Sequence, residues 1–142
     1  MSQKIQFFNE EIQFTLKNKM HLRKWVTDTL ESENFELGEL NFIFCSDTYL
    51  LKINQEYLNH NTFTDIITFD NSEENKEISG DIFISIDRVI ENANSLSIDF
   101  NDELHRVMIH GVLHLMGYPD KKKEEKYLMT AKEDHYLARR WS

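Results

Sequence analysis

The sequence has one cysteine, one proline and four glycines among its 142 residues, and these scarcities exclude several classes of protein. The single cysteine, Cys45, has no partner for an intrachain disulfide or a Cys-x-x-Cys metal site, which fits a reducing compartment. No apolar run reaches the roughly 18 residues of a membrane span. The N-terminus lacks the apolar core and small-residue cleavage site of a signal peptide. We therefore expect a cytoplasmic protein in which Cys45 is a small buried hydrophobe.

Positive charge is also scarce, because 25 acidic residues outnumber 16 lysines and arginines and give a formal net charge of −9. This excess argues against indiscriminate nucleic-acid binding by bulk attraction, and we expect no DNA partner. The charge is uneven, however. Residues 121–142 hold seven basic and four acidic side chains, whereas residues 1–120 hold nine and twenty-one. The basic segment, which begins with Lys121, Lys122 and Lys123, is either a solvated helix face or a local anchor for a phosphate backbone.

The length permits one buried core, and we expect a single domain over residues 1–142. Apolar runs predict strands near residues 5–8, 40–45, 65–69 and 82–86, the last two forming a hairpin across a polar turn at 70–80. Helical periodicity and capping residues predict helices at 16–33, after Ser46-Asp47, from Asp87 to Leu96, after Asn101-Asp102 and at 123–140. This order predicts an α+β fold: a small mixed four-stranded sheet covered by about five helices.

Six aromatic residues follow the predicted strands and helices as core residues do. We expect them to fill the core rather than to form a platform for base stacking: Phe7, Phe8, Phe14, Phe42, Phe44 and Phe83. The composition therefore offers no obvious aromatic surface for nucleic acid.

The most informative segment is His110-Gly-Val-Leu-His114-Leu-Met-Gly-Tyr-Pro-Asp120, which lies in an apolar helical stretch. His110 and His114 are four residues apart, so both imidazoles share one helix face about one turn apart. Gly117 is expected to end the helix with a positive φ, and Pro119 fixes the chain just beyond that end. Asp120 is thereby carried back toward the imidazoles. Two nitrogens and one carboxylate predict a metal site with one coordination position open for water, as catalysis requires.

The other histidines carry weaker indications. His105 lies about 140° around the helix from His110 and is expected to face elsewhere. His21 and His135 are expected at the surface. His60, in a polar turn, is either solvated or a donor to a bound ligand.

A divalent ion in such a site acidifies bound water and polarises a phosphoryl or carbonyl oxygen, so hydrolysis is the expected reaction. Zinc peptidases commonly carry His-Glu-x-x-His, with the glutamate as general base. Gly111 occupies that position here, which counts against a peptidase. An iron oxygenase with two histidines and one carboxylate shares the ligand set, but nothing in the sequence indicates a pocket for its co-substrate.

The same segment resembles the signature of the YbeY family of bacterial metal-dependent endoribonucleases. Two further segments match in the right order. Thr64-Asp65-Ile66-Ile67-Thr68-Phe69 resembles the family's Thr-Asp-Val-Leu-Ser-Phe strand, and Gly80-Asp81-Ile82-Phe83-Ile84-Ser85 resembles its Gly-Asp-Ile-x-Ile-Ser strand. Downstream, Glu125, Met129 and Glu133 fall where the family carries Glu, Met and Glu. The resemblance covers nearly the whole chain.

The resemblance implies a cytoplasmic, zinc-dependent, single-strand-specific endoribonuclease with one zinc ion per chain. Such enzymes act in 3′-end maturation of small-subunit ribosomal RNA and in ribosome quality control, so the expected partners are ribosomal RNA and the ribosome or assembling small subunit, with no membrane. His110, His114 and Asp120 would hold zinc, and His114 would be catalytic. The alternatives are a metal-dependent peptide hydrolase and a non-catalytic ribosome-assembly factor with a structural zinc.

Two departures from the family pattern bear on the chemistry. Family members usually show Gly-Tyr-Asp-His, whereas Asp120 here occupies the position of the third histidine. A carboxylate lowers the charge of the metal centre by one unit and should make bound water less acidic. The family also often carries an arginine after the tyrosine of Asn-x-x-Tyr, where this chain has Leu58. Either another cation replaces it, with Lys121 to Lys123 the nearest in sequence, or the activity of this chain is weak.

For four acidic residues, the sequence leaves two interpretations open. Asp65 and Asp81 flank strands, where a structural carboxylate and a functional one are equally plausible. Glu125 and Glu133 either orient the ligand imidazoles or lie at the surface of the final helix, and the surface is favoured for Glu125.

Overall fold

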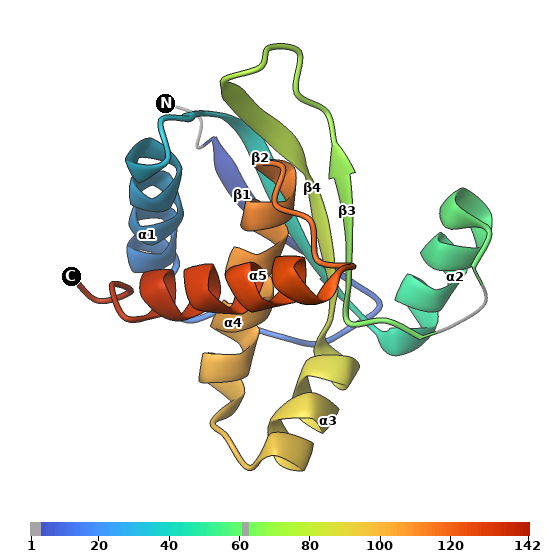
Figure 1. Ribbon diagram of the computed structural model, residues 1–142. Coiled ribbons are helices and arrows are strands. Elements are labelled where there is room, and N and C mark those ends of the chain that lie inside the picture. Colours follow the sequence, from blue (N-terminus) through green and yellow to red (C-terminus); the bar gives the residue numbers. More distant parts are fainter. Residues whose placement is uncertain (1–3, 61–62) are drawn as a thin grey trace.

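The computed structural model describes residues 4–60 and 63–142 (Figure 1). Residues 1–3 of the N-terminal segment that was compared with a signal peptide lie outside this part. The described elements are β1 (Ile5–Glu10), α1 (Lys19–Ser32), β2 (Glu36–Cys45), α2 (Asp47–Leu58), β3 (Ile66–Asp70), β4 (Glu77–Ser85), α3 (Ile86–Leu96), α4 (Phe100–Leu115) and α5 (Lys123–Leu137). No helix in these two stretches is both long enough and apolar enough to cross a membrane.

The strands form one mixed sheet in the order β1-β2-β4-β3. Strands β1, β2 and β4 run parallel, and β3 pairs antiparallel with β4 as the expected hairpin. The predicted α+β class, with four strands and five helices in the described residues, is confirmed. The polar turn at 70–80 was predicted too long, because β4 already begins at Glu77. The hydroxyl of Ser79 accepts from the backbone NH of Glu39 in β2, so a polar side chain fits this end of the sheet.

The caps of three helices test the local predictions. Ser46 caps α2 as expected, its hydroxyl accepting from the backbone NH of Tyr49. The cap at Asp87 was wrong: Ser85 caps α3, and Asp87 lies in the first turn, where its charge suits the helix dipole. The cap at Asn101-Asp102 was also wrong, because Asp99 caps α4. Each of these two helices therefore begins one to three residues earlier than predicted, at another residue whose side chain can accept from the first turn.

Helix α4 lies across β3 and β4, and α5 crosses α4 on the side away from the sheet (Figure 1). Gly111 permits this packing. A Cβ at that position would lie 2.9 Å from the side chains of Ile66 and Ile82, closer than real Cβ contacts allow. Because Gly111 faces the sheet, the imidazoles of His110 and His114 are left at the edge of the packed face.

The aromatic core is confirmed with one exception. Phe42 and Phe44 are fully buried in β2, and Phe7 of β1 stacks on Phe42 with a centroid distance of 5.6 Å. Phe8 was placed wrongly, because it is 45% exposed. It belongs to the edge strand β1, where alternate side chains point to the less covered face. Cys45 is buried as expected, and burial raises the pKa of its thiol to about 12.

Candidate metal centre

The end of α4 turns back as the sequence predicted. The helix ends at Leu115, and Gly117 takes a φ of 104°, a conformation that favours glycine. The backbone NH of Tyr118 then donates to the carbonyl of Leu113 at 3.1 Å. This reversal directs Asp120 back toward the helix face that carries His110 and His114.

Three ligand atoms converge where the chain reverses. Oδ2 of Asp120 lies 3.3 Å from Nε2 of His110 and 3.2 Å from Nε2 of His114. The two imidazole rings are 4.5 Å apart between centroids. Ligands about 2.1 Å from a tetrahedral zinc ion are separated by about 3.4 Å, so these spacings suit one ion. Within the described residues, this trio is the one group of histidines, cysteines and acids whose ligand atoms meet in this way.

Glu133 of α5 orients His110. Its Oε2 lies 2.6 Å from Nδ1 of His110, and its Oε1 accepts from Arg106 at 2.7 Å. A carboxylate only accepts hydrogen bonds, so Nδ1 carries a proton, and in the neutral ring Nε2 has the lone pair that can bind a metal. Of the two interpretations given to Glu133, the orienting one is therefore confirmed. Arg106 in turn is held by Asp134 at 2.5 Å.

The surroundings of His110 favour positive charge. Burial acts to lower the pKa of this imidazole, but the hydrogen bond to Glu133 and the negative charges of Glu133, Asp120 and Asp65 act more strongly and raise it. The same charges that favour an imidazolium favour a metal cation bound at Nε2. The donor set and its electrostatics therefore fit a divalent ion.

A pocket of about 530 Å³ opens beside the three ligands. It is lined by residues of α2, of the segment before β3, of β3 itself and of the α4–α5 connection, including Leu58, Phe63, Asp65 and Lys121. Burial raises the pKa of Asp65, although the charge of His110 opposes this shift. Nδ2 of Asn92 donates to Asp65 at 3.3 Å. The pocket thus leads to the three candidate ligand atoms beside a partly buried carboxyl group.

A second polar cluster holds the reversal from the side of α1. The hydroxyl of Tyr118 donates to Glu33 at 2.6 Å, and Nζ of Lys132 donates to the same carboxylate at 2.9 Å. The hydroxyl of Tyr136 also donates to Glu33. The turn that carries Asp120 is therefore tied both to α1 and to α5.

Comparisons with known proteins show which family the chain resembles. The model of the family described as "Endoribonuclease YbeY" matches residues 4–140. The chain is 52% identical over 134 residues to the endoribonuclease YbeY of Cytophaga hutchinsonii, covering 94% of each chain. It is 54% identical over 127 residues to that of Karelsulcia muelleri, covering 89% of each.

The chain belongs to the YbeY family. The solution structure of TM1509 from Thermotoga maritima has a similar fold, with a TM-score of 0.66 and 26% identity over 96% of this chain and 89% of that one. Two YbeY-like segments noted in the sequence, residues 64–69 and 80–85, contribute to the adjacent strands β3 and β4. The third segment carries the ligand trio, so the YbeY motifs meet at one place.

The remaining singled-out residues lie outside the trio. His105 faces away as expected: Nδ1 accepts from Arg140 at 2.7 Å, and burial followed by the charge of Arg140 lowers its pKa to about 4. His21, His60 and His135 are exposed, and His60 also lines the pocket. Asp81 accepts from Asn41 at 3.0 Å and so has a structural partner in β2. Glu125 accepts from the backbone NH groups of Lys121 and Lys122 and caps α5.

Sequence reasoning missed two groups at this YbeY site. Arg106 lies four residues before His110 on the same helix, and that spacing was its only local indication. Phe63 was not considered, because it lies in a polar connection rather than in a strand or helix. Both became recognisable only when α5 and α2 were placed beside α4 and β3.

Proposed function

We propose that this chain is a metal-dependent endoribonuclease that cleaves single-stranded RNA, built as one YbeY-like metallohydrolase domain over residues 1–142. The observation that carries the proposal is the approach of Asp120 to within 3.3 Å of the two imidazole nitrogens of His110 and His114. The names of the relatives, all given as endoribonucleases, support RNA as the substrate.

The proposed ligands of a single zinc ion are His110, His114 and Asp120. A bound zinc ion would acidify a coordinated water and stabilise negative charge on a phosphate oxygen. Glu133 accepts from Nδ1 of His110, so that Nε2 is the ring nitrogen that would bind the metal. His114 is assigned a catalytic role because its Nε2, with a side chain 26% exposed, faces the same point as the carboxylate of Asp120. Three protein ligands leave one position for water or substrate.

Lys121 is proposed to provide the positive charge that Leu58 does not. Leu58 lies in the pocket at the position of the family's arginine, and its side chain has no charge to offer a phosphate. Lys121 lies in the same pocket and is exposed. The basic segment that it begins would hold the RNA backbone beside the ligand trio.

The proposed substrate is ribosomal RNA of the small subunit, and the proposed role is maturation of its 3′ end and ribosome quality control in the cytoplasm. The ribosome or assembling small subunit would be the partner. These finer assignments rest on the family resemblance. A peptidase of the His-Glu-x-x-His type is disfavoured, because a glutamate in place of Gly111 would collide with Ile66 and Ile82 of the sheet.

The test couples metal content to cleavage. Purified protein is analysed for zinc before and after chelation, and each sample is assayed on single-stranded and duplex ribosomal RNA fragments. We expect cleavage of the single strand to be lost with zinc and regained on its return. His114→Ala should stay folded and cleave at least about 10³-fold more slowly, whereas His135→Ala should behave as wild type.

Two results would contradict the proposal. Cleavage that persists in the zinc-free protein and in His114→Ala would indicate another nuclease or another centre. Zinc-loaded wild-type protein that cleaves no RNA yet restores ribosome assembly would support the non-catalytic assembly factor instead.

A further inference from the structure

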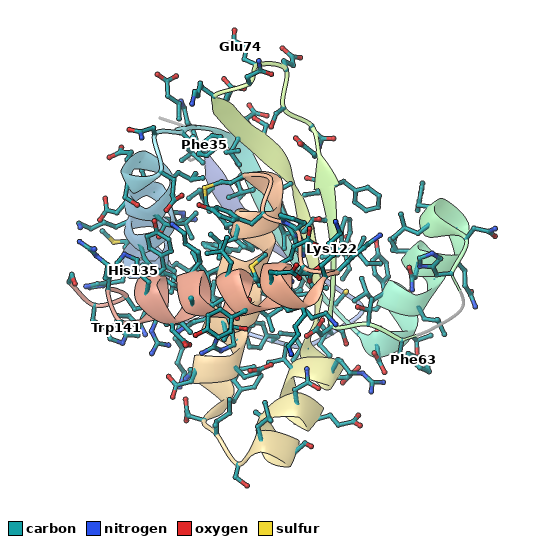
Figure 2. All side chains as sticks on the ribbon, viewed as in Figure 1. Phe35, Phe63, Glu74, Lys122, His135 and Trp141 are labelled. Carbon is teal, nitrogen blue, oxygen red and sulfur yellow. The ribbon has the colours of Figure 1, made fainter. Side chains whose placement is uncertain are left out.

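The pocket beside the ligand trio contains an exposed aromatic ring that the proposed metal chemistry does not use. Phe63 is 54% exposed and lies in the segment that leads from α2 to β3 (Figure 2). Leu58, 41% exposed at the end of α2, lines the same pocket. Apolar and aromatic side chains next to a few polar groups are typical of ligand sites.

The ring of Phe63 contacts a cation that is itself anchored by ion pairs. The guanidinium carbon of Arg88 lies 5.2 Å from the centre of the ring. Arg88 is itself paired with Asp47 at 2.7 Å and with Glu91 at 3.4 Å. One side of the ring therefore contacts an anchored group, while more than half of the side chain remains open to solvent. A ring ordered in advance loses less conformational entropy when a ligand stacks on it.

The residues around the ring match the parts of a nucleotide. The ligand trio and Lys121 line one part of the pocket and suit a phosphate. Phe63 offers a stacking surface, and the hydroxyl group of Thr68, also in the pocket, offers hydrogen bonds to a base edge. The hydroxyl group of Thr64 donates to the carbonyl of Ile66 at 3.3 Å and can still accept from a base. The volume of about 530 Å³ lies in the range that small-molecule sites occupy.

We propose that Phe63 is the stacking surface for one unpaired nucleobase of the RNA, beside the phosphate that faces His110, His114 and Asp120. This inference rests on the proposed function and adds a determinant of specificity to it. A base in a duplex has both faces covered by its neighbours, so only an unpaired base reaches the ring. Phe63 therefore contributes to the selection of single strands, with little preference among bases because each has an aromatic face.

The test measures binding separately from cleavage. A short single-stranded oligoribonucleotide carries the fluorescent base 2-aminopurine at each position in turn, and the fast quenching that accompanies stacking is followed before any cleavage occurs. Phe63→Ala and Phe63→Leu should lose the quenching and weaken Kd by about tenfold, whereas Phe63→Trp should keep both. Phe8→Ala, which removes an exposed phenylalanine from the far edge strand, is the matched control and should bind as wild type.

An abasic strand completes the comparison. Removing the base that stacks should weaken binding to the wild type by about as much as Phe63→Ala does, and Phe63→Ala should then cause no further loss. Binding by Phe63→Leu at wild-type strength would overturn the proposal in favour of a merely apolar contact. Unchanged RNA binding by Phe63→Ala, with loss of binding to small ribosomal subunits, would overturn it in favour of a protein partner.

The two proposals fail in different ways. Quenching that depends on Phe63 in a protein that cleaves no RNA would keep the stacking site and remove the nuclease. Zinc-dependent cleavage with Kd and quenching insensitive to every Phe63 variant would keep the nuclease and remove the stacking site.

Discussion

Glu33 and Glu133 both hold the region where α4 ends, one through Tyr118 and the other through His110. Glu33 accepts from the neutral hydroxyl groups of Tyr118 and Tyr136 and from the ammonium group of Lys132, which are poor ligands for a metal ion. Glu133 accepts from an imidazole, whose second nitrogen keeps its lone pair and faces Asp120. The two carboxylates are similarly buried, but only Glu133 has a partner with a nitrogen that can bind a metal.

This difference separates a structural polar cluster from a reactive one. The donors at Glu33 are used within the cluster, so its effect is to fix the turn that carries Asp120. Glu133 fixes both the orientation and the tautomer of the His110 ring, and it thereby directs Nε2 toward Asp120. The two clusters should therefore respond independently to substitution.

The largest effect is expected from Asp120→Asn. The amide keeps the size of the side chain but removes its negative charge, so zinc affinity should fall by more than about 100-fold, because loss of a mere supporting group already costs 10–100-fold. Zinc is titrated against a competing chelator. Asp120→His is the control that restores the usual family ligand and should keep the metal. Wild-type affinity in Asp120→Asn would remove Asp120 from the ligand set.

The paired variants Glu133→Gln and Glu33→Gln compare the clusters directly. Glu133→Gln should lower zinc affinity by about 10- to 100-fold, because the neutral amide supports His110 less well. Glu33→Gln should leave zinc affinity within about twofold but lower the free energy of unfolding by about 1–3 kcal/mol. Chelator competition and urea denaturation measure the two quantities. Equal losses of zinc affinity would show that the clusters act as one.

A smaller effect is expected from Tyr118→Phe, which removes one hydrogen bond to Glu33. The free energy of unfolding should fall by about 1 kcal/mol, with little change in zinc affinity because Gly117 and the backbone still direct the turn. Tyr127→Phe, at a residue 81% exposed on α5, is the control and should change neither. A large loss of zinc affinity in Tyr118→Phe would mean that the hydroxyl, rather than the backbone, positions Asp120.

The smallest effect concerns pH. Burial acts to raise the pKa of Glu33, but the hydrogen bonds from Tyr118, Tyr136 and Lys132 act more strongly and lower it below 4.5. A lowered carboxyl pKa stabilises the fold above the unfolded-state pKa, and this stabilisation is lost as pH falls through the folded-state pKa. The difference in unfolding free energy between wild type and Glu33→Gln should therefore be constant above about pH 6 and shrink below pH 4.5. Urea denaturation of chelated protein checks this; a difference that grows with acid would contradict it.

Much of the site was predictable because it is local in sequence. The spacing of His110 and His114, the positive φ at Gly117 and the return of Asp120 all involve residues within eleven positions of one another. The same holds for the hairpin of β3 and β4, where two apolar runs flank one polar turn. The caps at Ser85 and Asp99 were missed because several neighbouring polar residues can each cap a helix, and the backbone decides among them.

The sequence by itself determined the α+β class and the helical histidine pair, because periodicity and turn chemistry act between neighbours along the chain. Only the tertiary structure decided which groups support that pair. Glu133 reaches His110 because α5 crosses α4, and Glu33 reaches Tyr118 because α1 ends nearby. Phe63 lines the pocket because α2 and α4 both pack beside β3. Contacts between residues far apart in sequence depend on how whole helices and strands pack. The side-chain periodicity of one element does not predict which other elements will lie beside it.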